Sequence, residues 1–487
     1  MRRRVLASPY RDWVDPADVF SALYGTAENA FWLDSGIQAK AGMSYLGAAT
    51  RVVTASVAEG TITELSSGER RRGTIFDFLR DELAAGIEPD VAAGPFQLGW
   101  VGWLGYELRA QTMAVQWRQQ SRYPDAALQF ADRAIAFDHA AGTVTLLALG
   151  KEWIGDQADW RDATVAHLAS LSSTPGVSSL SSTPGVSGLS STPGVSGLSG
   201  SVSDRIEPRW AYSDEKYLAM IAECQATIAN GDAYQLCLTT EARVDARPDP
   251  TAVYLALRAS SPSHHGALLR VGEIALLSSS PEQFLSVTPE GVIGSKPIKG
   301  TRRRGATVAE DAALRAELAA SDKERAENLM IVDLMRNDIG RVSAVGSVSV
   351  PRLLAVESYA QVHQLVSTVR GVLAEGVSPV DAVVACFPAG SMTGAPKLSA
   401  TAILDQLEQR PRGIYSGVFG YFGLDGRVDL AMVIRSIVLD RDGATVGTGG
   451  GITALSVPTE ELDEVKLKAA ALLAVLAAAG QERPGDC

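Results

Sequence analysis

Hydrophobic residues along this chain fall into short runs that predict strands and into longer amphipathic stretches that predict helices. Strand-like runs occur at 134–137, 144–149, 275–279 and 284–287, and a helical pattern covers 214–230. Strands and helices both recur, but they do not follow one another in strict βαβ order. The pattern therefore favours an α+β fold or a layered α/β sandwich over a Rossmann sheet.

Glycine divides the N-terminal part of the chain. In the segment 99–106, Gly-Trp-Val-Gly-Trp-Leu-Gly-Tyr, a glycine occupies every third position. Because glycine commonly interrupts regular structure, we interpret this segment as a break between strands.

A nine-residue unit, Leu-Ser-Ser-Thr-Pro-Gly-Val-Ser-Gly/Ser, is repeated three times between Leu171 and Gly197. Each copy offers one Leu, one Val and no charge, which is too little apolar surface to offset the entropy of ordering. A β-solenoid would need a denser apolar repeat. We therefore expect a disordered Ser/Pro/Gly linker over 166–208, between an N-terminal region (1–165) and a catalytic region (209–487).

Two predicted helices carry pairs of acidic residues. Ser321 and Glu324 have capping-box spacing and begin a helix that runs to about 337. A second helix begins at Pro458. In each helix two glutamates are three positions apart, so both project from one face. The four carboxylates belong to Glu324, Glu327, Glu461 and Glu464.

The spacing of these glutamates leaves two interpretations open. Acidic residues favour the first turn of a helix, and Glu324 also suits the role of capping partner to Ser321, so a solvated face is the commoner explanation. Alternatively, carboxylate pairs from two helices suit a hard cation such as Mg²⁺, which keeps several of its waters.

Composition restricts the classes of partner. With 44 basic and 56 acidic residues the net charge is −12, which argues against a protein that binds nucleic acid. The most apolar run, 469–479, is too short to span a bilayer. The four cysteines are scattered without a Cys-x-x-Cys pair, as is typical of reduced thiols. We expect a soluble cytoplasmic protein with no membrane partner.

Five segments resemble, in order and spacing, the chorismate-utilising enzymes. They are Ser280–Glu282, Pro297–Thr301, Glu324–Asp338, Phe387–Lys397 and Gly449–Lys468. The resemblance implies an anthranilate synthase component I-like fold, with two large sheets flanked by helices. Several members of the family carry alanine where this chain has Lys299. By having lysine at this position, the chain resembles the large component of aminodeoxychorismate synthases.

The resemblance also assigns a metal and a substrate site. It implies Mg²⁺ as cofactor, bound directly at the positions of Glu327 and Glu464 and through water at those of Glu324 and Glu461. Arg435 and Lys468 match positions that bind a substrate carboxylate, and Tyr415 matches a hydroxyl donor to the same end of chorismate. The full set of implied substrate-binding residues is Gln235, Gly300, Thr301, His363, Tyr415, Arg435, Gly449, Gly451 and Lys468.

Two residues are implied to act at the ring. Glu282 matches the general acid/base of the family, and its apolar sequence neighbours are of the kind that raise the pKa of a carboxyl. Lys299 has two interpretations, as a nucleophile at C2 or as a cation paired with a substrate carboxylate. Gln235 stands where water-adding members have a lysine base, which favours an amine nucleophile.

The implied reaction is the Mg²⁺-dependent amination of chorismate at C4 to 4-amino-4-deoxychorismate, the precursor of p-aminobenzoate and so of folate. No amidotransferase motif is found, so we expect ammonia from a separate glutamine amidotransferase subunit. Segments 31–35 and 44–47 resemble a tryptophan pocket, which makes tryptophan a possible ligand. Anthranilate synthase component I, an aminodeoxyisochorismate synthase and a non-catalytic tryptophan-binding or scaffold relative remain alternatives.

Overall fold

The computed structural model describes residues 4–116, 118–172, 207–359 and 362–479. Most of the predicted linker, 173–206, lies outside the described residues. Residues 166–172, which we assigned to the linker, instead form the last turns of helix α4 (Asp156–Ser172). Leu168 on these turns is fully buried against the hydrophobic core, which explains why the helix continues past the predicted boundary.

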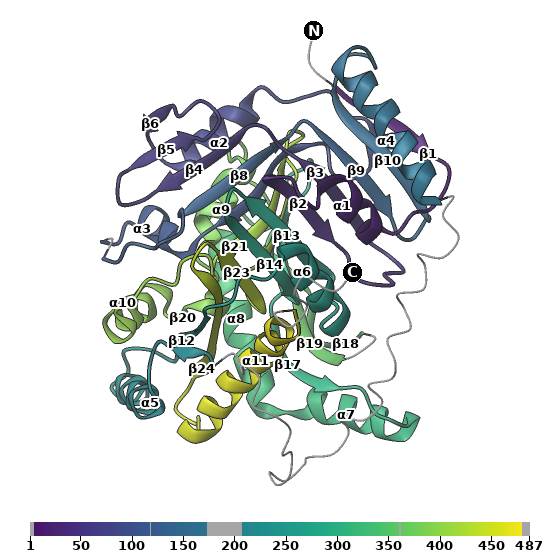
Figure 1. Cartoon of the computed structure of the whole chain (residues 1–487). Helices are drawn as coiled ribbons and strands as arrows, with labels where there is room; N and C mark the ends of the chain where they lie inside the picture. The colour runs from purple at the N-terminus through teal and green to yellow at the C-terminus, as the bar shows by residue number, and fades with distance from the viewer. Residues whose placement is uncertain (1–3, 117, 173–206, 360–361, 480–487) are drawn as a thin grey trace.

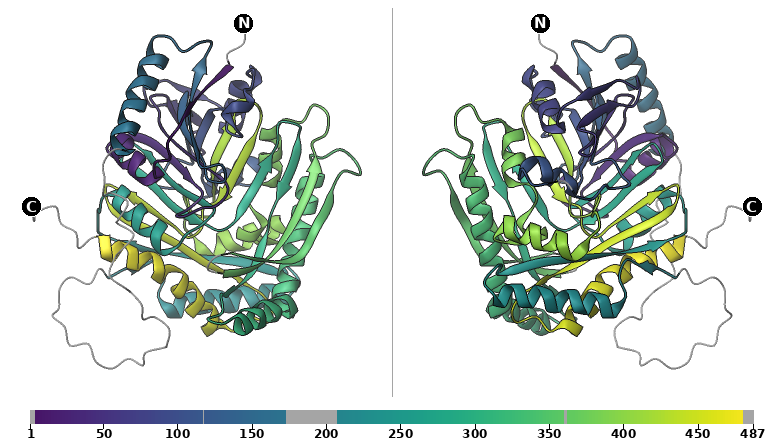
Figure 2. Two further views of the ribbon diagram at one scale, coloured as in Figure 1. Left: turned by 90° about the vertical axis from the view of Figure 1, so that its right-hand side faces the viewer. Right: turned by 90° about the vertical axis from the view of Figure 1, so that its left-hand side faces the viewer.

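Two 12-stranded sheets, antiparallel in every recorded strand pair, form the body of the molecule (Figures 1 and 2). In spatial order, the first sheet contains β1 (Arg4–Tyr10), β10 (Thr143–Gly150), β9 (Arg133–Asp138), β3 (Met43–Ala48), β2 (Asn29–Asp34), β13 (His265–Val271), β14 (Ile274–Ser280), β23 (Ser436–Asp440), β24 (Gly443–Ile452), β12 (Gln235–Val244) and β11 (Arg209–Trp210), with β20 (Gly394–Ala395) beside β12.

The second sheet contains, in spatial order, β17 (Ile298–Arg303), β19 (Val362–Val372), β16 (Val292–Ser295), β15 (Gln283–Val287), β22 (Val428–Met432), β21 (Val418–Gly423), β7 (Gly99–Leu104), β8 (Ala126–Ala131), β4 (Val52–Ser56), β5 (Thr61–Glu64) and β6 (Arg70–Arg72), with β18 (Ser349–Ser358) beside β19. This architecture confirms the predicted layered fold of two large sheets.

Helices cover the outer faces of the sheets (Figure 2). Besides α4 they are α1 (Pro16–Tyr24), α2 (Ile75–Ala84), α3 (Arg109–Thr112), α5 (Asp214–Ala229), α6 (Pro250–Ser260), α7 (Val308–Ala320), α8 (Asp322–Gly340), α9 (Pro379–Cys386), α10 (Lys397–Glu408) and α11 (Pro458–Ala479), with short 3₁₀ turns η1 (Val91–Ala93), η2 (Tyr106–Leu108) and η4 (Gly390–Met392). Among the described helices, none combines the length and hydropathy needed to cross a membrane.

Strands from the two predicted regions pair with each other in both sheets. In the first sheet Leu33 of β2 stands opposite Ala267 of β13, and in the second Val101 of β7 stands opposite Tyr421 of β21. Side chains from both sheets, such as Leu269 and Phe419, share one core cluster between the layers. The boundary near residue 165 therefore divides the chain but not the hydrophobic core.

Our interpretation of the glycine-rich segment 99–106 as a break between strands is wrong. Residues 99–104 form β7, every residue of which is buried. A Cβ on Gly102 would lie 2.0 Å from the carbonyl oxygen of Ala127, so glycine here permits the close approach of β8. The alternating neighbours Trp100 and Val101 pack into the cores on opposite faces of the sheet.

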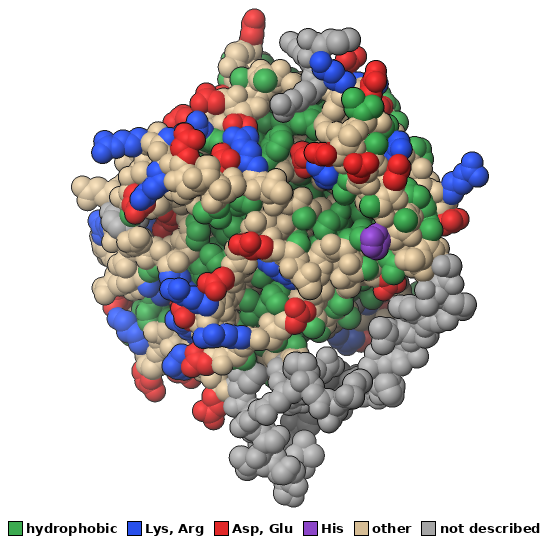
Figure 3. Space-filling model, turned by 45° about the horizontal axis from the view of Figure 1, so that its top comes forward, with side chains coloured by type: hydrophobic (Ala, Val, Ile, Leu, Met, Phe, Trp, Pro, Cys, Tyr) green, Lys and Arg blue, Asp and Glu red, His purple; other side chains and the backbone are tan. Residues whose placement is uncertain are grey.

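The two helices that carry the acidic pairs form as predicted. Ser321 caps α8 by accepting a hydrogen bond from the backbone N–H of Glu324. Helix α11 begins at Pro458, where the fixed backbone angle of proline suits the first turn. On the face of the molecule drawn in Figure 3, acidic and basic side chains are interspersed, and this face lacks the extended basic patch typical of nucleic-acid binding.

Candidate active site

A cavity of about 460 Å³ lies between β17, β24 and the acidic faces of α8 and α11. It collects nearly all the residues predicted for the site. Those that line it are Glu282, Lys299, Gly300, Thr301, Glu324, Glu327, Tyr415, Arg435, Gly449, Gly451, Glu461, Glu464 and Lys468.

The structure does not place His363 at the cavity. Its ring is buried, with Nε2 3.0 Å from Asp311 Oδ1 and Nδ1 2.8 Å from Ser358 Oγ. Successive side chains of a strand point to opposite faces, and the next residue of β19, Gln364, lines the cavity instead. The ring of His363 therefore links β19 to α7 and to β18.

Gln235 lies immediately behind the cavity wall. It is buried, and its Nε2 atom would be 2.2 Å from a Cβ placed on Gly451. The same Cβ would be 3.5 Å from Nζ of Lys299, so the amide and the amine meet at this glycine. The Gln235 Oε1 atom has no hydrogen-bond partner among the described residues.

The backbone of β17 lets Glu324 of α8 approach the strand closely at Gly300. The register between β17 and β19 shifts between Ile298 and Thr301, and Gly300 at the shift has a φ of 84°. A Cβ on Gly300 would lie 3.0 Å from the Glu324 carboxylate. Glycine is needed here both for the left-handed backbone and for the close approach of α8.

The two carboxylates of α8 that line the cavity are paired with cations from β17. Glu324 lies 3.3 Å from Arg302, and Glu327 lies 3.5 Å from the amine of Lys299. The side chains of Lys299 and Glu327 are only 16% and 13% exposed, so this second pair is poorly screened by water.

The carboxylates of α11 differ from each other in environment. Burial raises the pKa of Glu461, and the charge of Glu464 acts in the same direction. Burial also acts to raise the pKa of Glu464, but the Lys468 ammonium 2.8 Å away, together with the charges of Lys323 and Lys299, lowers the pKa below its usual value. The negative charges of two neighbouring carboxylates repel each other, and a cation bound between them would be stabilised by both.

Glu282 lines the same cavity as Lys299 from a buried position. Burial raises the pKa of Glu282 to about 7, although the Lys299 charge and a hydrogen bond with Ser391 act in the opposite direction. A carboxyl that holds its proton near neutral pH is suited to general acid catalysis.

Arg435 is the cavity cation whose side chain has no ion-pair partner among the residues that the structure describes. It joins β22 to β23 with a φ of 49°, a backbone region that costs a non-glycine residue energy and that is enriched at functional sites. Its guanidinium is thus available to a carboxylate ligand.

Glycines of β24 let three site residues approach the strand. A Cβ on Gly447 would lie 2.2 Å from the Tyr415 ring, and one on Gly450 would lie 3.0 Å from the Glu461 carboxylate. On the same strand the Gly449 carbonyl accepts a hydrogen bond from Lys468 at 3.1 Å. The glycine run therefore forms a flat wall against which Tyr415 and the acidic helix pack.

The comparisons with known proteins agree with this site. A model of the chorismate binding enzyme family matches residues 28–474. The chain belongs to the chorismate binding enzyme family.

Among relatives in this family, aminodeoxychorismate synthases of Streptomyces pristinaespiralis and Streptomyces griseus are both 44% identical, over 95% and 99% of this chain. The chain spans 64% and 66% of the lengths of these relatives. Anthranilate synthase component 1 of Mycobacterium bovis is 35% identical over 98% of this chain and 92% of its own.

The fold matches a solved member of the same family. The crystal structure of anthranilate synthase component I from Streptococcus pneumoniae superimposes with a TM-score of 0.73 at 25% identity, covering 96% of this chain and all of that one. The predicted anthranilate synthase component I-like architecture is thereby confirmed.

Several cavity residues of this family member escaped the sequence analysis. Arg302 pairs with Glu324 and Lys323 with Glu461, and Ser391 acts to lower the pKa of Glu282. Cys237 and Gln364 also belong to the lining. Ser391 stands inside the Phe387–Lys397 motif, which was the available signal for it. Burial raises the pKa of the Cys237 thiol.

The acidic residues of the cavity offer carboxylate oxygens, which are suitable ligands for a magnesium ion. Among the described residues, no three carboxylate, imidazole or thiol groups are arranged to hold a metal together. Mg²⁺ needs only one or two carboxylates, because it keeps several waters. Four carboxylates border one cavity here, each balanced by a lysine, arginine or serine contact that a cation can replace.

The segments that resemble a tryptophan pocket lie in β2 and β3 and are occupied by protein contacts. Asp34 bonds Arg258 at 2.6 Å, Tyr254 at 3.1 Å and Ser44 at 3.1 Å. Trp32 is fully buried and stacks on Phe20. The comparisons do not support tryptophan as a ligand.

Proposed function

We propose that this chain aminates chorismate at C4 to give 4-amino-4-deoxychorismate, in a Mg²⁺-dependent reaction. The observation that carries the proposal is that Lys299 and Glu282 line one cavity, close enough for the lysine charge to lower the Glu282 pKa. The names of the two relatives at 44% identity support it. The product is a precursor of p-aminobenzoate, and hence of folate.

Substrate binding follows from the charges that line the cavity. Chorismate carries two carboxylates, and the unpaired guanidinium of Arg435 would bind the first. Tyr415 and Lys468 stand on the same wall and offer hydrogen-bond donors, with the backbone N–H groups of the β24 glycines beside them.

The reaction uses the amine and the carboxyl in sequence. The free amine of Lys299 adds to C2 of the ring, the ring double bonds shift, and the C4 hydroxyl departs as water with the proton of Glu282. Ammonia then adds at C4, the double bonds shift back, and the Lys299 amine is expelled, while the new ammonium group returns one proton to Glu282. The net change is replacement of hydroxyl by amine with release of one water.

Glu327 and Glu464 would hold the magnesium ion, with Glu324 and Glu461 completing the acidic set. When bound, Mg²⁺ supplies a positive charge that fixes the ring carboxylate of the substrate. The protein's own task is to orient the ring so that C2 faces Lys299 and C4 faces Glu282, since both groups line the cavity.

Ammonia is proposed to come from a separate glutamine amidotransferase subunit. Gln235 supports ammonia over water as the nucleophile, because a neutral amide beside the cavity cannot deprotonate water. We also propose a cytoplasmic location, in keeping with the free thiols of the described cysteines Cys224, Cys237 and Cys386.

The test is to identify the product. The purified chain would be incubated with chorismate, Mg²⁺ and ammonium at alkaline pH, and the products separated by liquid chromatography and mass spectrometry. A product that aminodeoxychorismate lyase converts to p-aminobenzoate supports the proposal. Anthranilate would assign the activity of the 35%-identical relatives instead, and unchanged chorismate would favour a non-catalytic role.

A further inference from the structure

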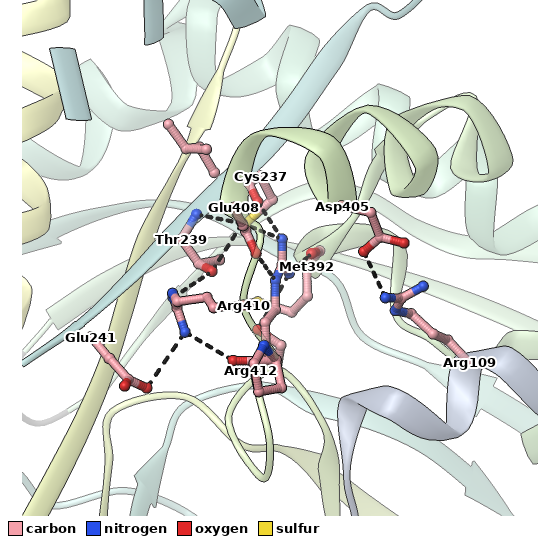
Figure 4. A network of polar contacts seen from close by, with 12 residues as sticks. Arg109, Cys237, Thr239, Glu241, Met392, Asp405, Glu408, Arg410 and Arg412 are labelled. Atoms are coloured by element: carbon pink, nitrogen blue, oxygen red, sulfur yellow. Dashed lines mark hydrogen bonds and ion pairs between the residues drawn. The ribbon is translucent and has the colours of Figure 1, made fainter. Parts of the chain in front are cut away.

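A fully buried ion pair lies behind the cavity, where α10 ends beside β12 (Figure 4). Arg412 and Glu408 have side-chain exposures of 1% and 4%, and two guanidinium nitrogens donate to the carboxylate at 2.8 and 2.9 Å. Neither side chain lines the cavity. Burying two charges carries a desolvation cost, and a well-packed apolar pair is often as stable.

The guanidinium of Arg412 also donates to two main-chain carbonyls of the cavity wall. It bonds the oxygen of Met392 at 2.6 Å and that of Cys237 at 2.9 Å. Met392 belongs to η4 and Cys237 to β12, and both line the cavity. One planar group therefore sets the separation of two cavity segments that come from distant parts of the sequence.

The other partners of the pair fix Arg412 itself. Glu408 accepts hydrogen bonds from the backbone N–H and the hydroxyl of Thr239 on β12, both at 2.9 Å. The guanidinium stacks over the Tyr106 ring at 4.4 Å. Because Glu408 and Tyr106 hold the Arg412 guanidinium, any shift of Arg412 would also shift η4 and β12.

The wall segment that Arg412 holds carries a partner of Glu282. Ser391, next to Met392 in η4, lines the cavity beside Glu282 and acts to lower the pKa of its carboxyl. On the other segment, Cys237 follows two residues after Gln235, which adjoins Lys299 at Gly451. The placement of both reacting groups thus depends on the two segments that the guanidinium joins.

We propose that Arg412, kept in place by Glu408, is a positioning residue that holds η4 and β12 at the separation at which Glu282 and Lys299 act on one substrate. This inference rests on the proposed function for the roles of Glu282 and Lys299. The alternative is a purely structural ion pair, which stabilises the fold without affecting catalysis.

The same helix offers a matched control. Arg109 pairs with Asp405 of α10 at 2.6 Å, and both side chains are largely buried at 7% and 17% exposure. No hydrogen bond recorded for Arg109 among the described residues reaches a residue that lines the cavity. Arg109→Met therefore removes a buried cation from the same region without releasing the wall.

The experiment compares Arg412→Met, Arg412→Lys, Arg109→Met and the double variant Glu408→Leu/Arg412→Met in the full chain, with ammonium as nitrogen source. The double variant removes both charges together and so leaves no unpaired buried ion if the single variant fails to fold. Arg412→Met and the double variant are expected to lower kcat about 100-fold with little change in KM. Arg412→Lys recovers about tenfold of the loss, and Arg109→Met keeps the parent kcat.

Amide hydrogen exchange of the 387–397 segment supplies a readout that does not depend on turnover. Faster exchange in the double variant but not in Arg109→Met supports the proposal. If the folded double variant keeps the parent kcat and the parent exchange, the proposal is overturned. Equal losses of kcat in Arg412→Met and Arg109→Met overturn it as well, in favour of a structural role. If the parent chain forms no aminated product, the proposed function fails, and exchange alone then decides whether Arg412 holds the wall.

Discussion

The amine of Lys299 lies 3.5 Å from the carboxylate of Glu327, in a pair of which less than a fifth of each side chain is exposed. The proposed nucleophile is thus bound to a proposed metal ligand. A cation held by Glu327 would compete with this pair and leave the amine free to face the substrate. The contact joins the two halves of the proposed chemistry, and it gives the first prediction.

Lys299→Ala and Lys299→Arg separate the two roles of this lysine. If the amine is the nucleophile, both variants lose aminated product by roughly 1000-fold or more, because arginine keeps the charge but cannot add to C2. Steady-state turnover with ammonium measures the loss. Near-normal turnover of Lys299→Arg would show that the lysine serves only as a cation.

Glu282 should govern the upper limb of the pH profile. Burial raises its pKa to about 7, so the proton that a general acid needs is present below that pH and lost above it. We expect kcat, measured at saturating free ammonia, to fall from about pH 6 to about pH 8.5. Glu282→Gln should lower kcat by about 10²–10⁴-fold and abolish the limb. A limb that persists in Glu282→Gln would assign it to another group.

Glu282 should also lower the free energy of unfolding at high pH. A carboxyl whose folded pKa is raised contributes stability that is present below its unfolded value and lost as pH rises through about 7. Glu282→Gln removes this penalty and should raise the free energy of unfolding above pH 7 by on the order of 3 kcal/mol. Urea denaturation at acid and alkaline pH gives the comparison. An equal effect at both pH values would contradict the assignment.

Arg435→Ala and Arg435→Gly form a matched pair. Both remove the guanidinium and should weaken chorismate binding by about 2–3 kcal/mol, roughly 30- to 150-fold in Kd. Glycine also relieves the left-handed backbone at φ 49°, so the glycine variant should melt above the alanine variant. Isothermal calorimetry and thermal melts test the two effects separately. Unchanged affinity in both variants would leave the substrate carboxylate without its proposed partner.

Glu464→Ala should abolish Mg²⁺-dependent turnover while the fold persists. The carboxylate borders the cavity from α11, whereas the preceding residue, Asp463, is not part of the lining. Asp463→Ala is therefore the control, and it should keep the parent response to Mg²⁺. Calorimetric titration with MgCl₂ adds a readout besides activity. Undiminished Mg²⁺ binding by Glu464→Ala would exclude this residue as a ligand.

Local sequence patterns predicted those parts of the molecule that local interactions determine. The cap at Ser321 and the spacing of Glu324 and Glu327 are properties of one helix, and α8 forms as expected. The segments that resemble the family come together around one cavity. His363 lies outside the cavity lining because a one-residue step along β19 decides which face a side chain occupies, and that step depends on register with β17 and β18.

Other features depend on contacts between distant segments. The glycines of β7 resembled breaks because the closeness of β8, which requires them, is invisible in the segment itself. The sequence around Arg412 carries no signal of its role in the cavity wall. The main-chain carbonyls that it bonds belong to residues 175 and 20 positions away, so only the assembled structure shows these contacts.

The interleaving of strands has a consequence for how the molecule is made. β2 has β13 as a neighbour and β7 has β21, so strands synthesised early leave the ribosome with an edge whose partner does not yet exist. The second sheet is incomplete until β22 has been translated, and the first until β23 and β24, near the end of the described chain, have followed. Because such long-range pairing is slow, nascent chains should depend on chaperones to protect those edges.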